Sequence, residues 1–163
     1  MRNFLPLLVI TSTFLIVGCV TQKIEDKELK TSFIEKSEPI KSLQDIIIKD
    51  PDNQFNYIEL ALLHKKSGDN KKALRFLTKS LNIKATTAGY IERGIIYSSF
   101  YNDQKSAIMD FTKALEISPK QEPALINRGL SFLKMNKFEQ ACNDFQELKN
   151  SKKAENLYSQ YCQ

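Results

Sequence analysis

Small and large apolar residues alternate with polar ones along this chain in a pattern that repeats every 34 residues. Alanine recurs at this spacing, at Ala73, Ala107 and Ala141. A large apolar side chain follows each alanine four residues later, at Leu77, Phe111 and Phe145. Because residues four apart share one face of a helix, the pattern predicts a series of equivalent helices, each with one buried face.

A second set of small residues precedes these alanines by 12 or 13 positions, at Ala61, Gly94 and Gly129. Two antiparallel helices approach closely where both carry a small residue, and large apolar neighbours fill the space beside the crossing. Each unit is therefore predicted to be a helical hairpin. The spacing from Gly94 to Ala107 is one residue longer than the spacing from Gly129 to Ala141, which predicts one extra residue in the turn around 101–104.

The residues between these positions strengthen the pattern. The second unit reads Tyr90-x2-Arg93-Gly94-x2-Tyr97, and the third reads Leu125-x2-Arg128-Gly129-x2-Phe132. Together with Ala107 and Ala141, these segments resemble the tetratricopeptide repeat, a family of 34-residue helix-turn-helix units. The resemblance implies an all-α fold, a right-handed superhelix of about three repeats with a C-terminal capping helix.

The same resemblance sets the expected domain organisation. A tetratricopeptide domain is expected over residues 40–163, after an N-terminal signal peptide and a tether. The expected segments are a signal peptide at 1–18, a tether at 19–39, a half-repeat at 40–53, repeats at 54–87, 88–121 and 122–150, and a capping helix at 152–163.

Two pairs of positions change from apolar to charged together. The first repeat carries Leu60 and Phe76, whereas the later repeats carry Arg93 with Asp110 and Arg128 with Asp144. Such joint changes are expected if the two side chains meet between the helices, so we predict two intra-repeat ion pairs. The alternative is four separately solvated charges.

The N-terminus has the features of an export signal. An apolar run over residues 4–17 follows Met1 and Arg2, and is shorter than the roughly 20 residues that span a membrane. The segment Leu15-Ile16-Val17-Gly18-Cys19 resembles the bacterial lipobox, which implies cleavage after Gly18 and acyl chains on Cys19 that anchor the chain to a membrane. Val20 favours the outer membrane of the bacterial envelope, facing the periplasm. The alternative is an ordinary signal peptide with a chance cysteine.

Two cysteines remain once Cys19 is lipidated. Cys142 and Cys162 form an even pair in a chain expected in an oxidising compartment. A turn near residues 150–152 would bring them side by side, which predicts a disulfide. The alternative is simple packing, because Cys142 occupies the position that Leu74 and Ile108 hold in the other repeats.

Composition and motifs argue against catalysis and against nucleic-acid binding. The net charge is +5, from 24 basic and 19 acidic residues, and the lysines form no continuous run. Such a surface is typical of solvated helices, with weak attraction to anionic lipid headgroups as the alternative. His64, the only histidine, occupies the position of Tyr97 and Phe132, and the chain shows no metal-ligand spacing or phosphate-binding loop. We therefore expect no cofactor and no enzymatic activity.

The resemblance assigns ligand contacts to the first helices of the hairpins. There the chain carries aliphatic residues with a basic rim, at Ile58, Leu62, Lys65, Lys66, Ile91, Ile95, Ser98, Ser99, Ile126, Asn127, Leu130, Leu133 and Lys134. This set predicts an apolar groove for an amphipathic helix or extended segment, and hence an adaptor for protein partners in the envelope. The alternatives are a groove covered by residues 31–40 or by a second copy, and a pilotin-like assembly factor.

Overall fold

The computed structural model describes residues 38–148 and 150–162, and all regular structure in these ranges is helical. The chain divides into two units, Met1–Ser42 and Leu43–Gln163. The expected signal peptide, Cys19 and nearly all of the expected tether lie outside the described residues. The first described segment, residues 38–49, is a helix that ends before Pro51.

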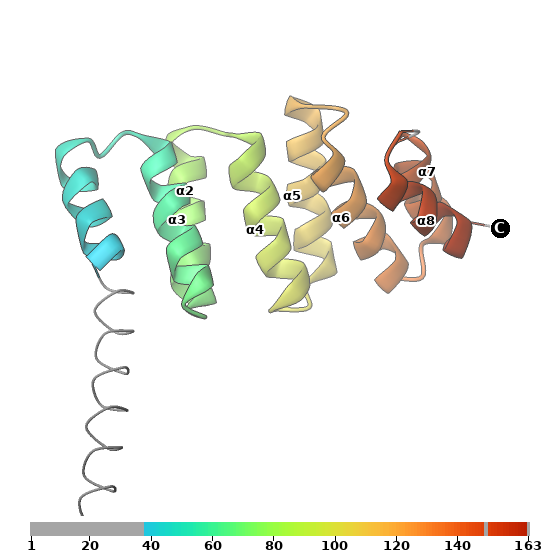
Figure 1. Ribbon diagram of the computed structural model, residues 1–163, viewed down its shortest axis with the longest axis horizontal. Helices are drawn as coiled ribbons and strands as arrows, with labels where there is room; N and C mark the ends of the chain where they lie inside the picture. The colour runs from blue at the N-terminus through green and yellow to red at the C-terminus, as the bar shows by residue number, and fades with distance from the viewer. Residues whose placement is uncertain (1–37, 149, 163) are drawn as a thin grey trace, which may run out of the picture. The chain divides into compact units, whose positions relative to one another are not determined.

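The second unit contains three successive helical hairpins and one final helix (Figure 1). The hairpins are α2 (Gln54–Lys66) with α3 (Asn70–Ile83), α4 (Thr87–Ser99) with α5 (Gln104–Ile117), and α6 (Glu122–Lys134) with α7 (Phe138–Gln146). The final helix α8 (Lys152–Tyr161) packs on α7. The predicted all-α fold of repeated hairpins with a C-terminal capping helix is confirmed. None of the described helices combines the length and apolar composition that crossing a bilayer requires.

Short polar side chains fix where most of these helices begin. Each accepts a hydrogen bond from a backbone N–H in the first turn, which would otherwise have no partner within the helix. The capping residues are Asn53, Asp69, Thr86, Asp103 and Ser151.

The turns within the hairpins share one backbone feature. Each contains a residue with a positive φ angle, namely Gly68 at 85°, Asn102 at 50° and Asn136 at 58°. These residues reverse the chain after the first helix of each hairpin, and glycine and asparagine tolerate that conformation best. The turn at 100–103 is one residue longer than the turns at 67–69 and 135–137, as the spacing of Gly94 and Ala107 predicts.

The helices of each hairpin cross where one small residue meets one large one. Gly94 meets Phe111 and Gly129 meets Phe145, while Ala61 and Leu77, at the equivalent positions of the first hairpin, belong to one apolar cluster. A Cβ atom added to Gly94 would lie 2.7 Å from Cε1 of Phe111, so only glycine permits this approach.

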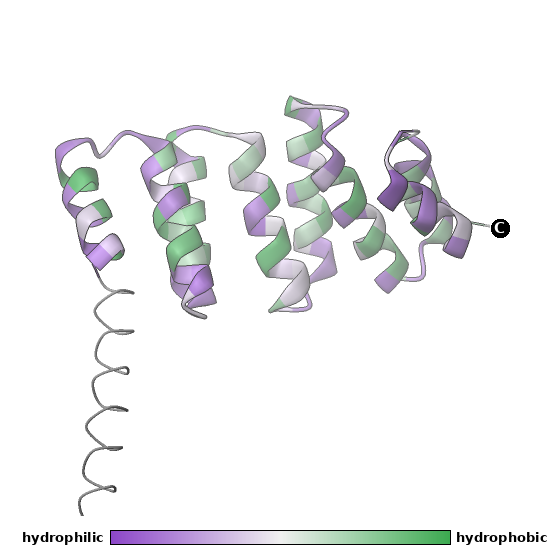
Figure 2. Ribbon diagram, viewed as in Figure 1, coloured by the Kyte–Doolittle hydropathy of each residue, from purple (hydrophilic) through white to green (hydrophobic). Residues whose placement is uncertain are grey.

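Neighbouring hairpins share apolar clusters. Ile96 of α4 packs with residues of the first hairpin, and Leu125 of α6 packs with Ile91 and Leu115 of the second. Figure 2 accordingly shows apolar positions recurring along the successive hairpins. The core therefore continues from one hairpin to the next, as expected for a stack of repeats.

Candidate partner-binding surface

A cleft of about 440 Å³ opens between the C-terminal halves of α4 and α6 and the end of α8. Its lining residues are Ser98, Ser99, Asn127, Leu130, Ser131, Leu133, Lys134 and Tyr161. Six of these eight belong to the groove predicted from the sequence. The cleft therefore occupies the C-terminal part of the predicted surface.

The cleft combines apolar and polar groups. Leu130 and Leu133 are half-buried, so part of each side chain remains open to a ligand. The Asn127 side-chain amide donates to the carbonyl of Pro123 at 2.7 Å, and Lys134 Nζ lies 3.4 Å from the carbonyl oxygen of Ser98. An apolar segment with polar or acidic flanks would match this arrangement.

Three isoleucines expected in the groove are buried instead. Ile58, Ile91 and Ile126 are only 8%, 7% and 3% exposed. Ile58 and Ile91 belong to the apolar clusters that join neighbouring hairpins, so their side chains stabilise the stack. The prediction that these three residues line a groove is wrong, because sequence spacing does not show which part of a helix the next hairpin covers.

The remaining predicted groove residues lie outside the cleft lining. Leu62 and Lys66 are exposed on α2, while Ile95 is half-buried against the core. Lys65 forms an ion pair with Glu92 of α4, which links two neighbouring first helices. The α2 positions therefore form a separate surface from the cleft.

Two cleft residues were not predicted from the sequence. Ser131 follows Asn127 by four residues on α6, so the helical period could have revealed it. Tyr161 comes from α8, whose end is tied to α7 by a disulfide between Cys142 and Cys162, with Cα atoms 5.6 Å apart. The sequence feature that could have indicated its position is Cys162, which directly follows Tyr161 and was predicted to pair with Cys142.

The structure brings together the four charged residues of the two predicted ion pairs. Nε and Nη2 of Arg93 donate to the carboxylate of Asp110, both at 2.8 Å. The same atoms of Arg128 donate to Asp144 at 2.9 and 2.6 Å. Hydrogen bonding to Asp110 raises the pKa of Arg93, while burial raises the pKa of Asp144 and the bonds from Arg128 oppose that rise. Both ion pairs are bidentate, and their aspartate side chains are buried.

Each arginine also reaches the preceding hairpin. Nη1 of Arg93 donates to Thr78 Oγ1 of α3 at 3.3 Å, and Nη1 of Arg128 donates to Thr112 Oγ1 of α5 at 3.1 Å. The two threonines are 34 residues apart, a regularity that the sequence analysis missed. These contacts form a repeated threonine–arginine–aspartate link between hairpins, which is a structural role.

His64 is a packed side chain. It is buried on α2 and stacks on Phe76, with ring centroids 5.3 Å apart. Burial lowers its pKa, and the nearby Lys72 lowers it further. Among the described residues, no group of three or more His, Cys, Asp or Glu side chains could hold a metal ion.

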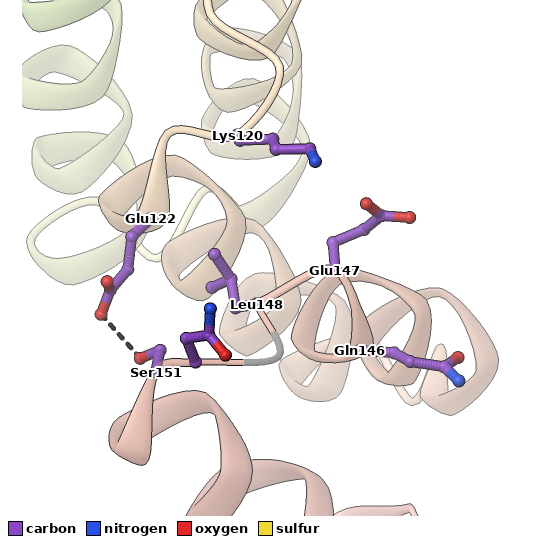
Figure 3. Close-up of a pocket in the computed structure, with 7 residues that line it drawn as sticks. Lys120, Glu122, Gln146, Glu147, Leu148 and Ser151 are labelled. Atoms are coloured by element: carbon purple, nitrogen blue, oxygen red, sulfur yellow. Dashed lines mark hydrogen bonds between the residues drawn. The ribbon is translucent and has the colours of Figure 1, made fainter.

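A second, larger pocket of about 720 Å³ lies where α6 begins and α7 gives way to α8 (Figure 3). It is lined mainly by polar residues, namely Lys120, Glu122, Gln146, Glu147, Leu148, Asn150 and Ser151. Ser151, the N-cap of α8, donates its hydroxyl to Glu122 Oε1 at 2.7 Å. This bond ties the start of α8 to α6, so we interpret the pocket as a junction between elements.

Comparison with known proteins supports the repeat assignment. A family model described as "Tetratricopeptide repeat" matches residues 56–87. Human tetratricopeptide repeat protein 6 is 27% identical over 96 residues, which cover 59% of this chain but only 18% of that protein.

Solved structures share the fold at low sequence identity. A tetratricopeptide repeat protein from Parabacteroides merdae superposes with a TM-score of 0.67 at 22% identity, covering 82% of this chain and 55% of that one. PilW, a type IV pilus biogenesis factor, superposes with a TM-score of 0.63 at 20% identity, covering 81% and 61%. The described hairpins therefore have the tetratricopeptide repeat fold.

Proposed function

We propose that this chain of tetratricopeptide-type hairpins is a non-enzymatic adaptor that binds a partner peptide or helix in the cleft between α4, α6 and α8. The observation that carries the proposal is the cleft itself, where half-buried Leu130 and Leu133 lie beside polar Ser99 and Lys134. Tetratricopeptide domains bind protein partners, and a cleft of this size and composition suits a short apolar segment.

The adaptor is proposed to act at the bacterial envelope. The support is the sequence from Leu15 to Cys19, which resembles a lipobox. Two or three acyl chains on Cys19 would supply at least the two signals that stable membrane anchoring requires. Labelled palmitate should enter the wild-type chain and not a Cys19→Ala variant. Equal labelling of both chains would refute the anchor.

The cleft assignment is tested by crosslinking in living cells. A photo-crosslinking amino acid placed at Ser99, on the exposed rim of the cleft, should capture the bound partner. Leu130→Glu puts a charge on the apolar part of the cleft and should abolish that capture. Met109→Glu, on an exposed position of the second helix α5, is the matched control and should preserve it.

Two outcomes would contradict the cleft assignment. One is unchanged capture with Leu130→Glu in a chain that melts at the wild-type temperature. The other is capture of the same proteins from a crosslinker at Met109. Either result would mean that partners bind elsewhere on the repeats.

The alternative function is a pilotin-like assembly factor for a secretin or pilus component. The observation in its favour is the structural similarity to PilW, taken together with the lipobox-like segment. Deletion of such a factor would mislocalise one outer-membrane oligomer. Deletion of a general adaptor would disturb several envelope proteins, so fractionation of outer-membrane complexes separates the two.

A further inference from the structure

One edge of the second unit is formed by the turns within the hairpins. The first helices α2, α4 and α6 end at this edge and the second helices α3, α5 and α7 begin there (Figure 1). Tyr161 lines the cleft together with Ser99 and Lys134, the last residues of α4 and α6, so the end of α8 lies near the same edge. The disulfide between Cys142 and Cys162 fastens this end to the middle of α7. We call this surface, residues 66–72, 99–105, 134–139 and 158–162, the turn edge.

Aromatic side chains are exposed on the turn edge. Phe100 and Tyr101, which are consecutive, are 57% and 49% exposed, and Phe138 at the start of α7 is 52% exposed. Tyr158 and Tyr161 at the end of α8 are also exposed. Single exposed aromatics are common, but a group of five on one edge indicates contact with something other than water.

The same edge is rich in lysine. Its exposed lysines are Lys66, Lys71, Lys72, Lys105, Lys134 and Lys137. Its acidic residues are Asp69, Asp103 and Glu139. The two aspartates are helix N-caps that accept backbone hydrogen bonds at 3.0 Å, so helix dipoles partly offset their charges. The turn edge is therefore net basic.

The opposite edge lacks this excess of positive charge. Within the described residues its acids are Asp50, Asp52, Glu116, Glu122, Glu147 and Glu155. Its lysines there are Lys49, Lys84, Lys120, Lys152 and Lys153. One strongly exposed aromatic side chain, Phe55 at the start of α2, lies on the opposite edge, against five on the turn edge. Basic charge and most of the exposed aromatic rings therefore coincide on the turn edge.

We infer that the turn edge rests on an anionic phospholipid surface. Lysines spread over three successive turns match the evenly distributed negative charge of such a surface, and phenylalanine and tyrosine rings favour the headgroup level of a bilayer. The inference builds on the proposed anchoring through Cys19, which would hold the domain close to the bilayer. Lys134 and Tyr161 belong to both the cleft and the turn edge, so this orientation brings one end of the cleft near the headgroups.

Single tryptophans can report this contact, because the chain has no tryptophan of its own. The lipidated full-length protein is reconstituted on phosphatidylethanolamine vesicles, with or without phosphatidylglycerol, that contain brominated lipid. Phe100→Trp and Phe138→Trp should show a blue shift and lose most of their emission to bromine quenching when phosphatidylglycerol is present. Ile117→Trp, on an exposed position at the opposite edge, is the matched control and should stay unquenched.

A charge variant tests the electrostatic part of the inference. Replacing Lys71, Lys105 and Lys137 together with glutamine should reduce quenching in the Phe100→Trp chain to the level of the Ile117→Trp chain, without changing the melting temperature. Three results would overturn the inference. The Phe100→Trp and Ile117→Trp chains could be quenched equally, neither could be quenched, or the quenching could be the same without phosphatidylglycerol. Quenching that requires added envelope proteins would also overturn it, since the edge would then bind protein.

Vesicle flotation separates this inference from the anchoring proposal. A chain that does not float with vesicles lacks its anchor, which refutes the anchoring proposal and removes the basis of the inference. A Phe100→Trp chain that floats but shows no quenching is anchored, and only the orientation is then wrong.

Discussion

At the crossing point of each hairpin, the size of one residue determines the size of its neighbour. Ala61 and Leu77 belong to one apolar cluster in the first hairpin, whereas Gly129 faces the larger Phe145 at the equivalent positions of the third. The hairpin with alanine at this position carries the smaller leucine, and the two hairpins with glycine carry phenylalanine. The two positions therefore form one packing unit.

Gly129→Ala should destabilise the domain by about 1–3 kcal/mol, the usual cost of adding a methyl group to a packed core. The new Cβ would overlap the buried ring of Phe145. Gly129→Ala with Phe145→Leu reproduces the first hairpin and should recover much of the loss. Urea unfolding of the single and double variants measures this coupling, and purely additive losses would show that the two residues are independent.

His64 should make stability depend on pH. Its pKa is lower in the folded chain than the unperturbed 6.5, so the unfolded chain takes up the proton first as the pH falls. The stabilisation of the fold by neutral His64 is therefore complete above about pH 6.5 and is lost as the pH falls below that value. Thermal melts from pH 8 to pH 5 should show a smaller decrease for His64→Phe, which carries the residue type of Phe132. Parallel decreases in both chains would contradict this prediction.

At the scale of helices, the two arginine–aspartate pairs fasten each first helix to its second. Asp110 is 1% exposed, so its charge has almost no access to water and depends on Arg93. In the first hairpin the corresponding positions carry Leu60, which is buried, and Phe76, which stacks on His64. The same two positions of the repeat are therefore apolar in the first hairpin and form an ion pair in the second and third.

Arg93→Leu should cost about 3–5 kcal/mol, because it leaves a buried carboxylate without its partner. Arg93→Leu with Asp110→Phe copies the pair from the first hairpin and should restore most of the lost stability. Chemical unfolding of the three chains tests this prediction. A double variant as unstable as the single one would show that the pair contributes more than mutual neutralisation.

The last helix depends on its covalent link. With ten residues and only Ala154 buried, α8 is too short to be stable as an isolated helix. Replacing Cys142 and Cys162 together with serine should reduce stability by roughly 3 kcal/mol, the chain-entropy estimate for a loop of this length. Amide hydrogen exchange should accelerate in α8 and remain unchanged in α2 and α3. Unchanged protection of α8 would show that packing alone holds it.

At the scale of the whole domain, the sequence predicted what depends on local spacing. The hairpins, the longer turn near Asn102 and the positions of closest helix approach follow from residues that are near each other in the chain. Burial of Ile58, Ile91 and Ile126 was missed, because it depends on how one hairpin covers the next. Tyr161 was missed for the same reason, since it reaches the cleft through the packing of α8.

The threonine–arginine–aspartate links also bear on how the domain unfolds. Arg93 and Arg128 each bind a carboxylate in their own hairpin and a hydroxyl in the preceding one. If one hairpin detached from the next, the arginine would lose its hydrogen bond to the threonine of the preceding hairpin. Partial unfolding between hairpins is therefore energetically unfavourable. We therefore expect the three hairpins, which these two links join in series, to unfold in a single cooperative transition.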